Sequence, residues 1–102
     1  MPSQPEAHDN PQASRYEIDV AGQVATAEYI RDGSTVTFTH TFVPEPLRGQ
    51  GLASRLIVAA LDAARTAGLT VVPQCPTFAA YMKLHPATQD LLGSEGRALL
   101  DA

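Results

Sequence analysis

Residues 38–61 read FTHTFVPEPLRGQGLASRLIVAAL, and this stretch decides the fold because it runs from a strand through a glycine-rich turn into a helix. The β-branched and aromatic residues at its start are typical of a strand. Pro44 ends that strand, since proline cannot donate to a sheet ladder. Residues 52–67 are rich in Ala and Leu, and Gly68 stands where helices commonly stop. We therefore predict a strand over 35–43 and a helix over 52–67.

The spacing of apolar residues predicts which faces of these two elements are buried. Alternation along the strand is expected to place four side chains on one face: Val36, Phe38, His40 and Phe42. In the helix, apolar residues recur at helical spacing and predict one broad buried surface: Leu52, Leu56, Ile57, Ala60, Leu61 and Ala64.

Upstream of this stretch, the sequence predicts two more strands. Apolar and charged residues alternate from Tyr16 to Val20, as expected for a half-buried strand. Residues 24–30 form a second one, and Asp32-Gly33 is a strong signal for a hairpin into the next strand. The first three strands are therefore expected to form an antiparallel meander.

Downstream, residues 69–72 form a short apolar strand, and the strand–helix–strand order predicts parallel pairing beside the strand over 35–43. Pro76 suits the first position of a second helix over 76–84. The expected fold class is α+β, a compact antiparallel meander followed by strand, helix, strand and helix. The helices are expected to pack on one mixed sheet.

Length and composition predict one folded domain. A chain of 102 residues with 44% hydrophobic residues fits a single domain with its own core. Residues 1–14 contain three prolines and no apolar period, so we expect a disordered N-terminal tail there. The domain is expected to span 15–93, followed by a C-terminal tail at 94–102.

Charge and cysteine content exclude several classes of function. The net charge is −4 and the seven basic residues are scattered, which argues against nucleic-acid binding. The single cysteine, Cys75, allows no intrachain disulfide, and no residue group has the spacing of metal ligands. Neither a signal-peptide pattern nor an apolar run of about 20 residues is present. We therefore expect a cytoplasmic protein without a metal or a membrane partner.

The most informative segment is the turn that joins the strand to the helix, Arg48-Gly49-Gln50-Gly51-Leu52-Ala53. A helix start carries unpaired N–H groups and about half a positive charge, and glycines let an anion approach the backbone. No Gly-Lys-Ser/Thr follows, so the turn is not a nucleotide P-loop. The pattern favours a phosphate or pyrophosphate site, and the alternative is a plain strand-to-helix turn.

This turn resembles a known family signature. Arg48-x-x-Gly51-x-Ala53 is similar to the Gln/Arg-x-x-Gly-x-Gly/Ala motif of the GNAT superfamily of N-acetyltransferases. The strand before it and the segment GLTVVPQCPTFAAYMKLHP after it extend the resemblance over roughly residues 16–92. The compact layout resembles, more narrowly, the short YjdJ-type subgroup.

The resemblance implies that the chain binds coenzyme A and uses acetyl-CoA as an acyl donor. Backbone amides of the turn, from Arg48 to Ala53 and including Gly49, Gln50, Gly51 and Leu52, would hold the pyrophosphate. The end of the third strand, at Phe42 and Val43, would pair with the pantetheine arm, for which the strands over 35–43 and 69–72 would splay apart. The chain lacks the N-terminal helices that commonly enclose the acceptor, so the partner amine stays unidentified, and the chain could be a monomer or a homodimer.

Three side chains are candidates for the chemistry. Cys75 precedes Pro76 and should cap the second helix, where a thiolate is stabilised; it is either a nucleophile or a packed core residue. Tyr81 lies in a segment similar to the GNAT pattern Tyr-x-Lys-x-Gly-Phe, which implies an acid that protonates the CoA thiolate; otherwise it packs on the sheet. His40 could accept a proton from the amine, or be a core histidine bonded to a neighbour.

The leading hypothesis is an acyl-CoA-dependent N-acyltransferase that acts on an amine, directly or through Cys75. One alternative is a non-catalytic acyl-CoA-binding or sensing module. Another is a small protein-interaction domain without a ligand.

Overall fold

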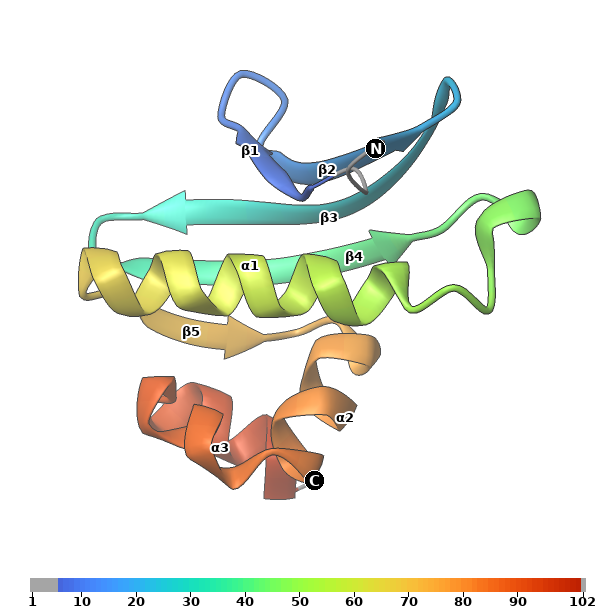
Figure 1. The fold of residues 1–102 in the computed structure, drawn as a ribbon. Helices are drawn as coiled ribbons and strands as arrows, with labels where there is room; N and C mark the ends of the chain where they lie inside the picture. Colours follow the sequence, from blue (N-terminus) through green and yellow to red (C-terminus); the bar gives the residue numbers. More distant parts are fainter. Residues whose placement is uncertain (1–5, 102) are drawn as a thin grey trace.

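A computed structural model of the chain describes residues 6–101. One sheet carries the strands in the order β1-β2-β3-β4-β5 (Figure 1). The pairings from β1 to β4 are antiparallel and that of β4 with β5 is parallel, which confirms the predicted α+β fold on a mixed sheet. The strands are β1 (His8–Asn10), β2 (Arg15–Val20), β3 (Gln23–Asp32), β4 (Thr35–Phe42) and β5 (Thr70–Pro73). The helical elements are η1 (Glu45–Leu47), α1 (Leu52–Ala67), α2 (Pro76–Leu84), η2 (Pro86–Leu91) and α3 (Ser94–Asp101).

Helix α1 crosses one face of the sheet (Figure 1) and has the predicted bounds. The six side chains predicted from its periodicity are the ones it buries. It ends where Gly68 adopts the left-handed region at φ 72°, and the N–H of Gly68 donates to the last turn of the helix. α1 contacts β2, β3, β4 and β5, so it organises the core.

A register shift in the β3–β4 ladder changes which β4 side chains share a face. Phe38 pairs with Tyr29, and Thr41 pairs with Ala27. Tyr29 and Ala27 are two positions apart on β3, so Phe38 and Thr41 face the same side of the sheet. The shift inserts an extra residue in β4, as a β-bulge does.

The prediction that Val36, Phe38, His40 and Phe42 share one face is therefore wrong beyond Phe38. His40 and Phe42 point to the opposite face and are exposed, whereas Val36 and Phe38 are buried. Simple alternation failed because the bulge shifts the side-chain period by one residue.

β4 and β5 pair over only the first half of β4. Their register ends at Phe38 opposite Pro73, and the N–H of Cys75 then donates to the carbonyl of Phe38 at 2.8 Å. After that bond the chain turns into α2. Among the described residues, no strand pairs with residues 39–42 on the β5 side, so the two strands part there as predicted.

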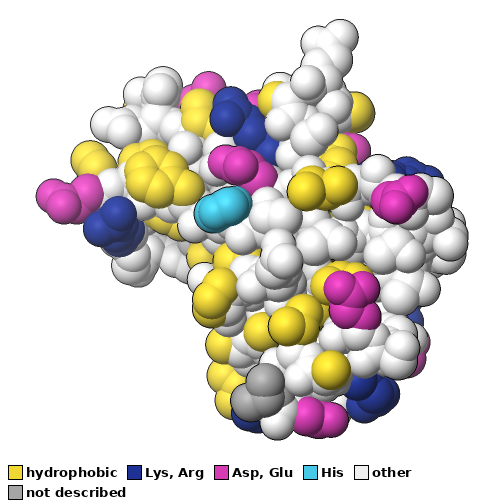
Figure 2. All heavy atoms as spheres, turned by 180° about the vertical axis from the view of Figure 1, so that it is seen from behind, with side chains coloured by type: hydrophobic (Ala, Val, Ile, Leu, Met, Phe, Trp, Pro, Cys, Tyr) yellow, Lys and Arg dark blue, Asp and Glu magenta, His cyan; other side chains and the backbone are white. Residues whose placement is uncertain are grey.

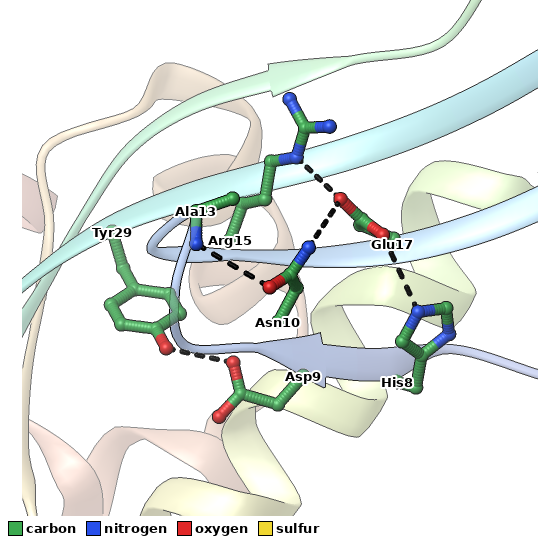
Figure 3. A network of polar contacts seen from close by, with 7 residues as sticks. All are labelled: His8, Asp9, Asn10, Ala13, Arg15, Glu17 and Tyr29. Carbon is green, nitrogen blue, oxygen red and sulfur yellow. Dashed lines mark hydrogen bonds and ion pairs between the residues drawn. The ribbon is translucent and has the colours of Figure 1, made fainter.

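Residues 8–10 form strand β1 and residues 11–14 turn the chain into β2, where the sequence predicted a disordered tail over 1–14. Strand β1 pairs with β2, and polar side chains of β1 form hydrogen bonds and an ion pair with neighbouring strands (Figure 3). Asn10 Nδ2 donates to Glu17 of β2 at 3.2 Å, His8 Nε2 lies 3.4 Å from the same carboxylate, and Tyr29 donates to Asp9 at 2.7 Å. β1 has no apolar period, and these contacts add to its backbone pairing with β2. Residues 1–5 of the predicted tail lie outside the described residues.

The C-terminal segment forms helix α3, where the sequence predicted a tail. α3 contacts β5 and α2, and Leu100 is buried. Gly96 lets the helix approach the sheet, because a Cβ there would lie 2.8 Å from the carbonyl oxygen of Val71. The helix escaped prediction because its contacts with β5 and α2, through a single glycine and a single buried leucine, leave a weak apolar pattern in the sequence.

Candidate functional site

The glycine-rich turn forms a hollow at the start of α1. η1 follows β4, and Gly49 and Gly51 then adopt left-handed conformations at φ 83° and 76°. Such angles favour glycine strongly. The hollow measures about 220 Å³ and its lining is formed by Val43, Leu47, Arg48, Gly49, Gly51, Leu52, Ala53 and Ser54.

The N-terminus of α1 offers donors to an anion. Gly51 is the N-cap and supplies no side-chain hydrogen bond, and the first turn of the helix contains no acidic residue. The first N–H groups of a helix have no acceptor within the helix itself. A Cβ on Gly49 or Gly51 would meet no atom within 4 Å, so the turn faces open space. Donor chemistry and space therefore both suit a phosphate or diphosphate group.

A hydrogen bond from Arg48 connects the turn to the residue that follows β4. Arg48 Nε donates to the carbonyl oxygen of Val43 at 3.0 Å, and the side chain is exposed. Of the residues predicted to hold coenzyme A, Phe42 and Gln50 are exposed and do not line the hollow. Leu47 and Ser54 line it without having been predicted, although their positions beside the motif were a usable signal.

Cys75 lies where β4 and β5 part. It is the N-cap of α2, as predicted, and is only 4% exposed. Its Sγ lies 3.4 Å from Oγ1 of Thr41, so the two side chains share a hydrogen bond. The sequence did not predict this contact, because Thr41 faces Cys75 only after the bulge in β4.

The surroundings of the Cys75 thiol lower its pKa. Burial is the largest single effect and raises the pKa, because it disfavours the charged thiolate. Hydrogen bonds from the Thr41 hydroxyl, from the backbone amides of Phe78 and Thr77 and from the Thr77 hydroxyl outweigh burial. Donors at a helix start stabilise a thiolate in this way. Cys75 is therefore a buried thiol that ionises more readily than an ordinary cysteine.

The other two predicted catalytic side chains take no part in the hydrogen bond between Thr41 and Cys75. Tyr81 is partly buried two turns along α2, and its ring stacks on His85 at a centroid distance of 3.9 Å. His85 Nδ1 lies 2.7 Å from the carbonyl oxygen of Tyr81. His40 follows the bulge and is exposed on the face away from Thr41. The structure thus brings Cys75 to Thr41 and leaves His40 across the sheet.

The remaining surface carries mixed charge. Seen from behind, in Figure 2, Lys and Arg side chains lie interspersed with Asp and Glu, and no continuous basic patch covers this face. Within residues 6–101, no cluster of three His, Cys, Asp or Glu side chains could hold a metal ion. None of the helices described for those residues has the length and apolar character to span a bilayer.

Comparison with known protein families gives a match. A family model described as GCN5-related N-acetyl-transferase matches residues 15–91, which is well over half of the chain. The matched range begins at β2 and ends at the last residue of η2, so it includes the glycine-rich turn, Thr41 and Cys75.

Proposed function

Because the chain belongs to the GCN5-related N-acetyltransferase family, we propose that it transfers the acetyl group of acetyl-CoA to an amine. The observation that carries this proposal is the hollow at the start of α1. Two left-handed glycines and an uncapped helix N-terminus leave backbone donors facing open space. We assign the pyrophosphate of coenzyme A to these donors, since backbone N–H groups at a helix start suit a diphosphate.

The proposed path of the pantetheine arm follows the unpaired half of β4. Residues 39–42 have backbone groups without a strand partner on the β5 side. We assign Phe42 and Val43 to the outer end of this path and Cys75 to its inner end. Val43 keeps only part of its pairing capacity for a ligand, because Arg48 already donates to its carbonyl oxygen. The path leads from the hollow to the one ionisable thiol of the chain.

In the proposed reaction, the Cys75 thiolate attacks the carbonyl carbon of the thioester. The bond from that carbon to the CoA sulfur breaks, Tyr81 protonates the departing thiolate, and an S-acetyl group stays on Cys75. The neutral acceptor amine then attacks this thioester and loses a proton to the Tyr81 phenolate, and the products are an amide and the Cys75 thiolate. His40 lies on the opposite face of the sheet and takes no part in this step. Thr41 stabilises the Cys75 thiolate at both stages, because its hydroxyl lies 3.4 Å from Sγ.

The short connections of the sheet support placement in the YjdJ-type subgroup. β2 and β3 are joined by the turn Ala21-Gly22, and residues 11–14 join β1 to β2. Neither connection contains the helices that commonly enclose an acceptor in this family. We therefore propose an open acceptor site that admits amines of different sizes.

The test is incubation of the purified chain with acetyl-CoA, followed by thiol titration of free CoA and mass spectrometry of the protein. The proposal expects free CoA and one added acetyl group on Cys75, lost when a primary amine is supplied. Calorimetric binding of coenzyme A without either product would identify a binding module and refute acyl transfer. Acetylation of the amine by a Cys75→Ala variant at the parental rate would refute only the route through the thiol.

A further inference from the structure

A second hollow lies at the opposite end of α1 from the glycine-rich turn. It measures about 170 Å³ and is enclosed between the C-terminal half of α1 and the first strands of the sheet. Alanines of α1, among them Ala60, Ala63 and Ala67, form one wall, and Phe38 closes the other. Short side chains on the helix leave the space that larger residues would fill. A cavity of about 150 Å³ can hold a benzene ring, so this hollow has room for a phenyl or branched alkyl group.

The mouth of this hollow carries two tyrosines and two opposite charges. The rings of Tyr16 and Tyr29 lie 5.7 Å apart, and the Tyr29 hydroxyl donates to Asp9 at 2.7 Å (Figure 3). Burial, and then the charge of Asp9, raise the pKa of Tyr16, while Arg31 lowers it. Both charges therefore act on the same phenol.

Asp9 and Arg31 each hold one side-chain hydrogen bond, Asp9 from the Tyr29 hydroxyl and Arg31 through Nε to the Gly33 carbonyl at 3.4 Å, and their other polar atoms can meet a ligand. Both are exposed and both line the hollow. Within residues 6–101 neither forms an ion pair, and the ion pairs found there join other residues. A carboxylate and a guanidinium at one mouth complement a ligand that carries an ammonium and a carboxylate together.

We propose that this hollow binds a free α-amino acid with an aromatic or branched apolar side chain. The side chain occupies the space between Phe38 and the alanines of α1. The ammonium group contacts Asp9 and the tyrosine rings, whose faces attract a cation. The carboxylate contacts Arg31. This site is separate from the proposed acyl-CoA site and does not depend on acyl transfer.

The test is a titration of the full ¹⁵N-labelled chain with L-phenylalanine, followed by amide chemical shifts. The expected result is a saturable shift of the amides of Tyr29, Ala63 and Ala67, with half-saturation at or below about 10 mM for a ligand of this size. Glycine lacks the apolar group and should bind at least about tenfold more weakly. Phenethylamine and 3-phenylpropanoate each lack one charge and should also bind more weakly than phenylalanine.

Three variants test the contacts. Asp9→Asn keeps an acceptor for the Tyr29 hydroxyl and removes the charge, so it should weaken binding about fivefold or more. Arg31→Gln should have a similar effect. Ala63→Leu fills the hollow and should abolish binding, whereas Thr66→Leu, on an exposed position of the same helix, should leave it unchanged.

Absence of a saturable shift with L-phenylalanine would overturn the proposal. Tighter binding of phenethylamine or of 3-phenylpropanoate than of phenylalanine would overturn the assignment to a zwitterion. Should Ala63→Leu fail to fold, Asp9→Asn and Arg31→Gln decide the outcome, and unchanged affinity in both would refute the site. None of these readouts involves acyl-CoA, so failure here leaves the proposed acyl transfer intact.

Discussion

The hydroxyl of Thr41 lies 3.4 Å from the thiol of Cys75, although 34 positions separate the two residues in the chain. Two features create this contact. The bulge in β4 turns Thr41 toward the face of Phe38, and the bond from the Cys75 N–H to the Phe38 carbonyl fixes the start of α2 beside it. The bulge and the parting of β4 and β5 therefore together bring the Thr41 hydroxyl to the Cys75 thiol.

Thr41→Val should raise the pKa of Cys75. The hydroxyl stabilises the thiolate and valine cannot, so the thiol of the variant should ionise at higher pH. The measurement is the rate of alkylation by iodoacetamide against pH, in which the midpoint of the profile should move upward.

Thr41→Ser keeps the hydroxyl and should keep the parental midpoint. Thr39→Val removes a hydroxyl that donates to the backbone of Glu28 instead, so it should leave the profile unchanged. An unaltered midpoint in Thr41→Val would mean that the donors of α2, which are two backbone amides and the Thr77 hydroxyl, lower the pKa of the thiol without Thr41.

Gly51→Glu should abolish coenzyme A binding without unfolding the protein. Its Cβ would meet no atom within 4 Å, so the cost to the fold is the strain of a left-handed backbone, about 1–3 kcal/mol, and the carboxylate would stand at the helix start. The carboxylate would accept hydrogen bonds from the first backbone N–H groups of α1 and would repel a diphosphate. Calorimetry should show affinity reduced at least about tenfold, by analogy with the loss of charge-assisted hydrogen bonds.

Gly33→Glu is the matched control. Gly33 is also left-handed, at φ 59°, and a Cβ there also meets open space, so both variants carry similar backbone strain. Equal loss of coenzyme A affinity in the two variants would assign the effect to strain and would contradict the proposed pyrophosphate site.

The sequence predicted what local periodicity and turn chemistry determine. The bounds of α1, its buried face and the pairing order of β2 to β5 follow from apolar spacing, Asp32-Gly33 and Gly68. The glycines of the candidate site were recognisable because left-handed backbone demands that residue.

What the sequence did not predict depends on contacts between distant segments. The bulge in β4 reflects how that strand meets β3, and it reverses the face expected for His40. β1 is held by side-chain hydrogen bonds to Glu17 and from Tyr29, which no apolar pattern records. Thr41 could not be recognised as a partner of Cys75 until the bulge in β4 and the bond from the Cys75 N–H to the Phe38 carbonyl were known.

Glu17 should make the protein less stable in acid. The hydrogen bond from Arg15 lowers the pKa of Glu17 against the opposing effect of burial, and Asn10 contributes further. Because the folded-state pKa lies below the ordinary 4.5, this stabilisation is complete above that pH. It is lost as the pH falls through the folded-state pKa. The free energy of unfolding, measured by urea denaturation at neutral and acidic pH, should therefore change less with pH in Glu17→Gln than in the parent. The difference should be up to about 1 kcal/mol, because solvent partly screens the pair.

Glu28→Gln removes an exposed carboxylate on β3 and serves as the comparison. An equal change of pH dependence in Glu17→Gln and Glu28→Gln would mean that the effect comes from removing a carboxylate and not from the contacts of Glu17. If the unfolding free energy of Glu17→Gln changes with pH as much as that of the parent, the contacts in Figure 3 do not stabilise the charged carboxylate of Glu17.

Gly96→Ala should destabilise the protein, in contrast to the usual effect of this substitution in a helix. Alanine normally stabilises a helix interior by about 0.5–1 kcal/mol relative to glycine. At Gly96, however, the new Cβ would lie 2.8 Å from the carbonyl oxygen of Val71 and 2.8 Å from Cδ2 of Leu92. Since a backbone carbonyl cannot move aside cheaply, we expect a net loss of about 1–3 kcal/mol in the free energy of unfolding, measured by urea denaturation.

The reverse change at Ala98 separates packing from helix propensity. Ala98 is exposed on the same helix, so Ala98→Gly should cost only the propensity difference of about 0.5–1 kcal/mol. The same helix should thus prefer glycine at one position and alanine two residues later, which propensity alone cannot produce. A Gly96→Ala variant as stable as the parent would mean that α3 does not pack against β5 and that residues 94–101 add nothing to the core.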